Sequence, residues 1–191
     1  MKTAILIIAA GASRRLGQPK QLVPYRDTFL LNYIINQCLN SNIGDVFVVL
    51  GANRSQIEPK ISSQQVTLIY NEHWSEGMST SIGCGSSFIQ NLDYEAVIVM
   101  LGDQPFFQSK LLKQIIEKQI ATKARIVISN YDRGMGPPSF FNATLFDELA
   151  QLRGDVGAKP IIRKYFNEIE RIAFPKGYID IDNPSDLKYL L

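Results

Sequence analysis

The sequence predicts a three-layer α/β/α protein with a mostly parallel central sheet, and three features of the 191-residue chain lead to this prediction. Short runs that are apolar throughout recur along the chain, as expected of strands buried on both faces of a sheet. Segments with the three- and four-residue spacing of helices separate these runs. The glycine-rich and acidic segments follow the predicted strands, where open α/β sheets bind their ligands.

Five predicted strands share a continuous apolar character, at residues 3–9, 45–50, 66–70, 96–101 and 125–129. Helical spacing predicts helices over residues 29–39, which Asp27 or Thr28 would cap, and over residues 111–120. The crossover at residues 54–61 is short and contains a proline. Towards the end of the chain we expect helices at 145–152, 158–166 and 184–191, and short strands at 171–174 and 178–181.

Composition indicates an ordinary globular protein, with 46% hydrophobic and 20% charged residues. We expect one domain over residues 1–191, because no repeat or low-complexity linker divides the chain. A net charge of +2 is too small to indicate a nucleic-acid or membrane surface. The apolar run at residues 4–10 is too short for a signal peptide, and Cys38 and Cys84 form no disulfide pattern. We therefore expect a cytoplasmic protein without a nucleic-acid or membrane partner.

The loop after the first predicted strand has the composition of a phosphate-binding segment. Its small residues let successive N–H groups form an anion-binding concavity, and two cations follow. It is neither a P-loop nor a dinucleotide-binding motif, because Gln18 stands where a P-loop needs lysine and the glycine spacing differs. An ordinary strand-to-helix turn with solvated cations is the alternative. The candidate phosphate-binding residues are Ala10, Gly11, Ala12, Ser13, Arg15 and Lys20.

The strand predicted at residues 96–101 leads into Gly102-Asp103-Gln104-Pro105. A carboxylate at this rim can bind a hard cation that bridges to phosphates, whereas an ordinary turn is the alternative. A second carboxylate is available from Asp180 or Asp182, which strand alternation places on one side. Asp182 is alternatively a cap of the last helix, and the choice between the two aspartates stays open. The candidate metal ligands are thus Asp103, Asp180 and Asp182.

Two further regions indicate a binding site. Residues 71–81 lead from the third strand into a helix near Ser79, and Gly77, Met78 and Ser81 there can approach a nucleobase. We add Gly102 to these candidate nucleotide-binding residues. Glycine and proline clusters at 134–141 and 152–159 predict fixed loops over the site, with plain turn chemistry as the alternative.

The segment AAGASRRLGQPKQL resembles the signature of molybdenum cofactor cytidylyltransferase-like (MobA/MocA-type) NTP transferases, and more loosely that of sugar-nucleotide pyrophosphorylases. In this signature, Ala-Gly-x-Ser-x-Arg-Met-Gly-x-x-Lys, Leu16 replaces the usual methionine. The Gly-Asp-x-Pro motif is similar to the metal-binding motif of the family. The resemblance implies that Gly11 and Ser13 contact phosphates and that Arg15 and Lys20 stabilise their developing charge.

The resemblance also implies a fold and a reaction. The fold is a Rossmann-like nucleotidyltransferase domain of the GT-A-like kind. The reaction is Mg²⁺-dependent transfer of CMP from CTP to the phosphate of a small acceptor, molybdopterin, with release of pyrophosphate. Asp103 would be catalytic together with Arg15 and Lys20, and the Gly-Met-x-x-Ser segment would line the base pocket.

Three alternatives stay open beside this reading. GTP is the alternative nucleotide, although guanylyl-transferring relatives carry Pro-Leu-x-Gly where this chain has Gln21-Leu22-Val23-Pro24. A sugar or alcohol phosphate is the alternative acceptor, because Lys159 replaces an arginine that is common on the acceptor side of the family. The third alternative is a non-catalytic accessory protein that delivers a cofactor to a molybdoenzyme.

Overall fold

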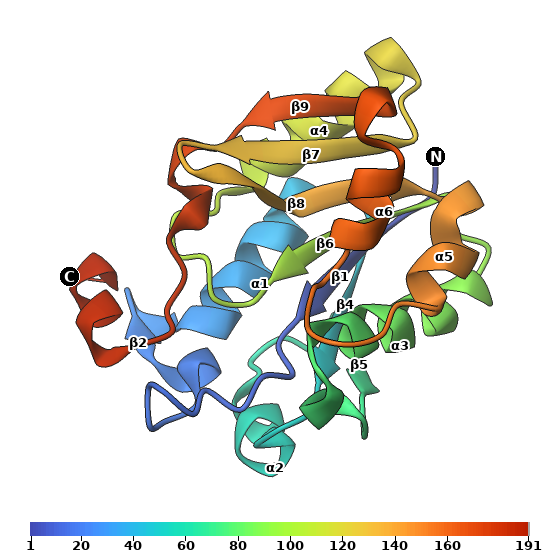
Figure 1. The fold of residues 1–191 in the computed structure, drawn as a ribbon. Coiled ribbons are helices and arrows are strands. Elements are labelled where there is room, and N and C mark those ends of the chain that lie inside the picture. Colours follow the sequence, from blue (N-terminus) through green and yellow to red (C-terminus); the bar gives the residue numbers. More distant parts are fainter. Residues whose placement is uncertain (191) are drawn as a thin grey trace.

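The computed structural model describes residues 1–190, which form a seven-stranded sheet with helices on both faces (Figure 1). The strand order is β5-β4-β1-β6-β8-β7-β9. Within this sheet, as described for residues 1–190, β8 runs antiparallel to both neighbours, and the other neighbouring pairs are parallel. The mostly parallel sheet predicted from the sequence is therefore confirmed. The strands are β1 (Thr3–Ile8), β4 (Asp45–Leu50), β5 (Val66–Tyr70), β6 (Ala96–Leu101), β7 (Ile126–Tyr131), β8 (Gly134–Asn142) and β9 (Ile169–Ala173).

The two faces of the sheet contribute to two separate apolar cores. In β1, Ile5 and Ile7 pack on the core beneath α1 and α4, whereas Leu6 points into the core beneath α3, α5 and α6. The helices are α1 (Leu30–Ser41), α2 (Arg54–Ile57), α3 (Met78–Gln90), α4 (Ser109–Thr122), α5 (Phe146–Ala150) and α6 (Lys159–Lys164). Because both faces are covered, the central strands β1, β4 and β6 are apolar except at the first residue of β1 and of β4, which is the pattern seen in the sequence.

Short elements complete the fold. A hairpin of β2 (Pro24–Tyr25) and β3 (Thr28–Phe29) precedes α1. The 3₁₀ turns are η1 (Lys20–Leu22), η2 (Glu58–Lys60), η3 (Trp74–Glu76), η4 (Ala143–Leu145), η5 (Phe166–Glu168), η6 (Pro175–Tyr178) and η7 (Pro184–Leu190). The helix predicted at residues 184–191 is thus the 3₁₀ helix η7. The last residue of that prediction, residue 191, lies outside the described residues.

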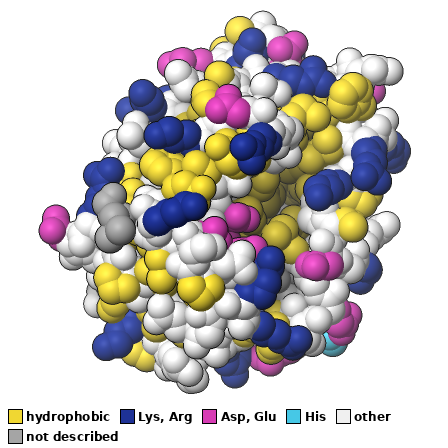
Figure 2. Space-filling view, turned by 60° about the vertical axis from the view of Figure 1, so that its left-hand side comes forward, with side chains coloured by type: hydrophobic (Ala, Val, Ile, Leu, Met, Phe, Trp, Pro, Cys, Tyr) yellow, Lys and Arg dark blue, Asp and Glu magenta, His cyan; other side chains and the backbone are white. Residues whose placement is uncertain are grey.

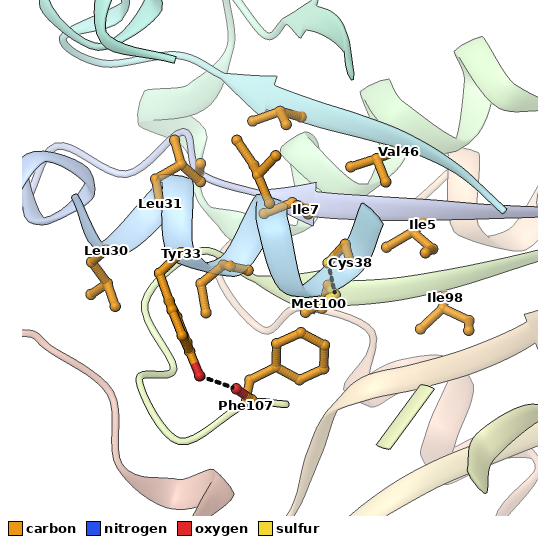
Figure 3. Close-up of a cluster of buried hydrophobic side chains, with 14 of the residues drawn as sticks. Ile5, Ile7, Leu30, Leu31, Tyr33, Cys38, Val46, Ile98, Met100 and Phe107 are labelled. Carbon is orange, nitrogen blue, oxygen red and sulfur yellow. Dashed lines mark hydrogen bonds between the residues drawn. The ribbon is translucent and has the colours of Figure 1, made fainter. Parts of the chain in front are cut away.

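Two contacts between polar or sulfur atoms lie within the core on the α1 side (Figure 3). The Tyr33 hydroxyl donates a hydrogen bond to the Phe107 carbonyl oxygen at 3.0 Å. Cys38 is fully buried and its thiol lies 3.3 Å from the Met100 sulfur. Burial raises the pKa of this thiol far above its ordinary value, so Cys38 serves as a small apolar side chain.

Residues 134–141 were predicted to form a loop, and this prediction is wrong. They belong to β8, which pairs with both β6 and β7. The ladder between β7 and β8 shifts register between Ile128 and Ser129, and this irregularity accommodates Pro137 and Pro138, which have no N–H to donate. Phe140, which is fully buried, supplies the strand character that the glycines and prolines concealed.

Two smaller predictions are also wrong. The first helix begins at Leu30, and neither Asp27 nor Thr28 caps it, because Thr28 is paired with Tyr25 in the β2–β3 hairpin. Residues 178–181 form no strand among the described residues, since η6 ends at Tyr178 and an extended segment follows. The alternation expected there is nevertheless present, because Ile179 and Ile181 are buried.

The fully buried Ile98 on β6 tests the importance of the α1-side core. Ile98→Ala should lower the free energy of unfolding by about 2–5 kcal/mol, because the surrounding sheet cannot close the cavity. Ile120→Ala is the matched control, since Ile120 is 56% exposed on α4, and its effect should stay within about 0.5 kcal/mol. Urea unfolding of both variants checks this, and equal losses would contradict the assigned core.

Candidate functional site

The loop after β1 is held in shape by its own backbone and by one buried amide. Ser13 adopts a φ of 53°, and its carbonyl oxygen accepts hydrogen bonds from Leu16 and Gly17, both at 3.1 Å. The Gln21 side chain, 1% exposed, donates to the carbonyl oxygens of Ala9 at 2.7 Å and Gly11 at 3.2 Å. Sequence analysis missed this role of Gln21, because a glutamine after a loop carries no local signal.

The loop leaves open space beside Gly11. A Cβ atom built on Gly11 would meet no atom within 4 Å, so the backbone leaves room there for a ligand. The Ser13 hydroxyl accepts a hydrogen bond from the Lys20 backbone N–H at 3.0 Å, which ties the start of the loop to its end. Backbone N–H groups, a hydroxyl and two cations therefore share one short stretch of chain, as an anion site requires.

The turn after β6 lies beside this loop. The Gly102 N–H donates to the Ile8 carbonyl oxygen at 3.1 Å, which joins the carboxyl ends of β6 and β1. Asp103 is 5% exposed, and its Oδ1 has no hydrogen-bond partner among the described residues. A buried carboxylate oxygen without a partner is costly, so its position calls for a cation or a ligand.

Lys20 binds two aspartates from distant parts of the chain. Its Nζ forms an ion pair with Asp103 Oδ2 and another with Asp182 Oδ1 at 2.8 Å. Arg15 Nη2 contacts the other oxygen, Asp182 Oδ2, at 2.7 Å. Burial alone would lower the pKa of Lys20, but Asp103 and then Asp182 outweigh it and raise that pKa well above its ordinary value. Lys20 is thus a permanent cation.

The three predicted metal ligands lie together. One carboxylate oxygen from each of Asp103, Asp180 and Asp182 lies within 4.8 Å of the others. Asp182 is bound by Lys20 and Arg15. Its side chain does not cap the terminal turn among the described residues. Asp186 accepts hydrogen bonds from the N–H groups of Asp182 and Asn183 instead. This oxygen-only ligand set suits a divalent cation.

Asp180 has an unfavourable electrostatic environment. Partial burial, the charge of Asp103 and then that of Asp182 raise the pKa of the Asp180 carboxyl from 3.8 to about 6. Lys20 opposes this shift without cancelling it. A cation at this place would favour the ionised form.

The start of α3 forms the opposite wall together with the loop at residues 153–157. The Met78 N–H donates to Asp155 Oδ1 at 3.0 Å, and the Ser79 N–H donates to the Gly154 carbonyl oxygen at 2.9 Å. Gly77 has a φ of 113°, and a Cβ there would overlap the Gly154 carbonyl group. The segments 71–81 and 152–159, predicted separately from the sequence, therefore meet.

These elements enclose a cleft of about 500 Å³. In the face drawn in Figure 2, acidic side chains lie beside a hollow near the centre, and Lys and Arg side chains surround it. Asp103 and Asp182 also line the cleft. Sequence analysis did not assign Asp155 or Glu76, which line it as well. All ten predicted nucleotide-binding residues line the cleft: Ala10, Gly11, Ala12, Ser13, Arg15, Lys20, Gly77, Met78, Ser81 and Gly102.

A cleft at the carboxyl ends of parallel strands, with a glycine-rich loop on one side and an acidic cluster at its floor, defines a nucleotide-binding α/β protein. A family model for the MobA-like NTP transferase domain matches residues 5–169. The chain belongs to the MobA-like NTP transferase family. The resemblance drawn from the sequence and the predicted fold class are both confirmed.

The chain is also similar to two curated relatives and to solved structures. Nicotine blue oxidoreductase of Paenarthrobacter nicotinovorans is 27% identical over 166 residues, covering 83% of this chain and 80% of that protein. Purine catabolism protein PucB of Bacillus subtilis (strain 168) is 24% identical over 166 residues, covering 83% and 79%. The crystal structure of Rv0371c from Mycobacterium tuberculosis H37Rv has a TM-score of 0.87 and 28% identity, covering 100% and 97%. Rv0371c in complex with manganese has a TM-score of 0.80 and 25% identity, covering 100% and 98%.

No helix among residues 1–190 is both long enough and apolar enough to cross a membrane.

The raised pKa of Asp180 predicts a pH-dependent stability of the metal-free protein. The folded state favours the neutral carboxyl, so ionising Asp180 between its ordinary pKa of 3.8 and about 6 costs stability. Asp180→Asn removes this cost. The unfolding free energy of Asp180→Asn should therefore equal that of the unaltered protein near pH 4. The variant should become the more stable of the two as the pH rises to about 7, and the difference should then level off.

Urea unfolding in the presence of a chelator measures this gain across the pH range. The exposed Asp147→Asn variant on α5 is the control for replacing a carboxylate by an amide outside the cleft. A gain that is independent of pH would contradict the assigned environment of Asp180.

Proposed function

We propose that this protein transfers a nucleoside monophosphate, CMP from CTP, to the phosphate of a small acceptor and releases pyrophosphate. The observation that carries the proposal is the ion pairing of Lys20 and Arg15 with Asp103 and Asp182, which line a cleft walled by a glycine-rich loop. The Asp180 carboxylate lies close to both of these aspartates, although Asp180 is not among the residues that line the cleft. Family membership supports a transferase that acts on a nucleoside triphosphate. We infer from the sequence resemblance that molybdopterin is the acceptor and that the reaction occurs in the cytoplasm.

The acidic cluster has the properties of a divalent-cation site. The partnerless Asp103 Oδ1 and the neighbouring Asp180 carboxylate offer hard oxygen donors. We assign Asp103 and Asp180 as the ligands, because both oxygens of Asp182 are paired with Lys20 and Arg15, whereas Lys20 pairs with only one oxygen of Asp103. Bound Mg²⁺ would supply Lewis-acid polarisation of the phosphoryl oxygens. The manganese complex of Rv0371c supports a divalent metal in this fold.

The residues around the cleft would act by positioning and by charge. The N–H groups of residues 10–13 and the Ser13 hydroxyl hold the triphosphate, and Lys20 and Arg15 offset the charge that grows on it. An oxygen of the acceptor phosphate forms a bond to the α-phosphorus. The bond from that phosphorus to the bridging oxygen breaks, and its electron pair leaves with pyrophosphate. Orientation within the cleft lowers the barrier without a side-chain nucleophile.

The base would lie against the start of α3. Gly77, Met78 and Ser81 line that part of the cleft, and Met78 is 39% exposed there. Ser81 is buried and accepts a hydrogen bond from Asn71 at 3.0 Å, which fixes its side chain. We favour CTP over GTP because the chain lacks the Pro-Leu-x-Gly segment that is typical of guanylyl-transferring relatives.

Loss of the Lys20 ammonium group or of the buried Asp103 carboxylate should abolish most turnover. Lys20→Ala and Asp103→Ala should each lower the rate of pyrophosphate release by about 100-fold or more, since a group that stabilises transition-state charge is lost. Lys118→Ala is the matched control, because Lys118 on α4 pairs with Glu170 outside the cleft at 3.7 Å. Near-normal release from either cleft variant would overturn these roles, provided that circular dichroism shows an intact fold.

Nucleotide choice can be read from thermal stability. At 100 times its dissociation constant a bound ligand adds about 2.7 kcal/mol to the unfolding free energy. CTP with Mg²⁺ should therefore raise the melting temperature more than GTP with Mg²⁺ at equal concentration, and a chelator should remove most of the increase. A larger shift with GTP would reverse the assignment of the base. An increase without pyrophosphate release in a panel of molybdopterin, sugar phosphates and alcohol phosphates would favour a delivery protein.

A further inference from the structure

Gln104, which follows the buried aspartate, is the centre of a hydrogen-bonded clamp. Its side chain is 2% exposed, and Nε2 donates to the Gly177 carbonyl oxygen at 2.7 Å and to the Tyr131 hydroxyl oxygen at 3.1 Å. The Pro137 carbonyl oxygen lies within reach at 3.3 Å and also accepts a hydrogen bond from the Tyr131 hydroxyl. A single amide thus joins the turn after β6, the β7–β8 pair and η6.

The clamp is closely packed around the Tyr131 ring. A Cβ at Gly177 would overlap this ring, and a Cβ at Gly136 would lie 2.6 Å from its hydroxyl oxygen. The ring also packs edge-on against Phe174, with centroids 5.8 Å apart. Because glycine leaves room on two sides, the ring and the backbone of η6 hold each other in place.

The segment that begins at Gly177 and is held by the clamp carries the carboxylates of Asp180 and Asp182. Gly177 shortly precedes Asp180, and beyond Asp180 the Ile181 N–H donates to the Asp103 carbonyl oxygen at 3.3 Å. Two hydrogen bonds therefore flank Asp180 and join its segment to Asp103 and Gln104. The separation of the carboxylates of Asp103 and Asp180 depends on this connection.

Only one end of the Gln104 amide is satisfied by hydrogen bonds. Gln104 Oε1 is buried and has no hydrogen-bond partner among the described residues, so the side chain retains an uncompensated desolvation cost. Asn32 is different: it is also buried, but its Nδ2 donates to Lys60 at 2.8 Å and its Oδ1 accepts from Ser62 at 3.3 Å. Asn32 is a satisfied structural amide, which makes it a matched control.

We propose that Gln104 is a positioning residue that sets the spacing of Asp103 and Asp180 and thereby the affinity of the acidic cluster for a divalent cation. The inference rests on the proposed function, because it takes these two aspartates as the ligands. Gln104 itself touches neither the cation nor the nucleotide. It acts through Asp180 by fixing the Gly177 backbone.

Mn²⁺ binding without nucleotide tests this role, with free Mn²⁺ measured by electron paramagnetic resonance. Gln104→Met keeps the length of the side chain and removes its donors, so Mn²⁺ affinity should fall at least tenfold. Asn32→Leu should lower the melting temperature but leave Mn²⁺ affinity unchanged. In turnover assays Gln104→Met should raise the KM for the metal, with kcat restored at saturating metal. Equal affinity losses in both variants, or unchanged affinity in Gln104→Met, would overturn the proposal.

A double-mutant cycle shows whether Gln104 acts through Asp180. Asp180→Asn should weaken Mn²⁺ binding by itself, and adding Gln104→Met to it should then have little further effect, because coupled residues are not additive. A full additional tenfold loss in the double variant would contradict the proposed route. Should Gln104→Met fail to fold, Tyr131→Phe loosens the same clamp and must lower Mn²⁺ affinity for the proposal to stand. Failure of the unaltered protein to bind Mn²⁺ would instead refute the metal site itself, and this inference with it.

Discussion

Repulsion among three carboxylates at the edge of the sheet is the constraint on which the site depends. Like charges held a few ångströms apart in a partly buried place repel strongly, because little water is available to screen them. Lys20 reaches two of the three aspartates and Arg15 reaches one. Partial burial and the charges of Asp103 and Asp182 raise the pKa of the remaining aspartate, Asp180. Positive charge is therefore favoured beside these carboxylates, and the open loop after β1 next to them is shaped for an anion. A cation that contacts both the carboxylates and the bound anion would suit both groups.

The topology of the sheet brings these opposite charges together. The parallel strands β1 and β6 are neighbours, so the cationic loop and the Asp103 turn leave the sheet at the same edge. After β9 the chain returns through η6 to this edge and adds Asp180 and Asp182. The antiparallel β8 contributes the Pro137 carbonyl oxygen to the clamp around Gln104. Local chemistry and long-range topology thus meet in one cleft.

The sequence predicted the parts of the molecule that have local signals. Continuous apolar runs identified the parallel strands, and residue types after those strands identified the loop at residues 10–20 and Asp103. Strand β8 was missed because its glycines and prolines have the composition of a turn, and only its pairing with β6 and β7 makes it a strand. Gln21 and Asp155 were missed for a related reason: their roles consist of contacts to backbone groups, and neither stands in a pattern that shows them.

The most direct test of the account is a crystal structure with Mn²⁺ and a non-hydrolysable CTP analogue. The account predicts an anomalous peak within about 2.5 Å of oxygens from Asp103 and Asp180, a distance typical of such ligands. It also predicts the triphosphate on the N–H groups of the loop after β1, with Lys20 against it. A metal bound away from these aspartates, or a triphosphate outside this loop, would contradict the account.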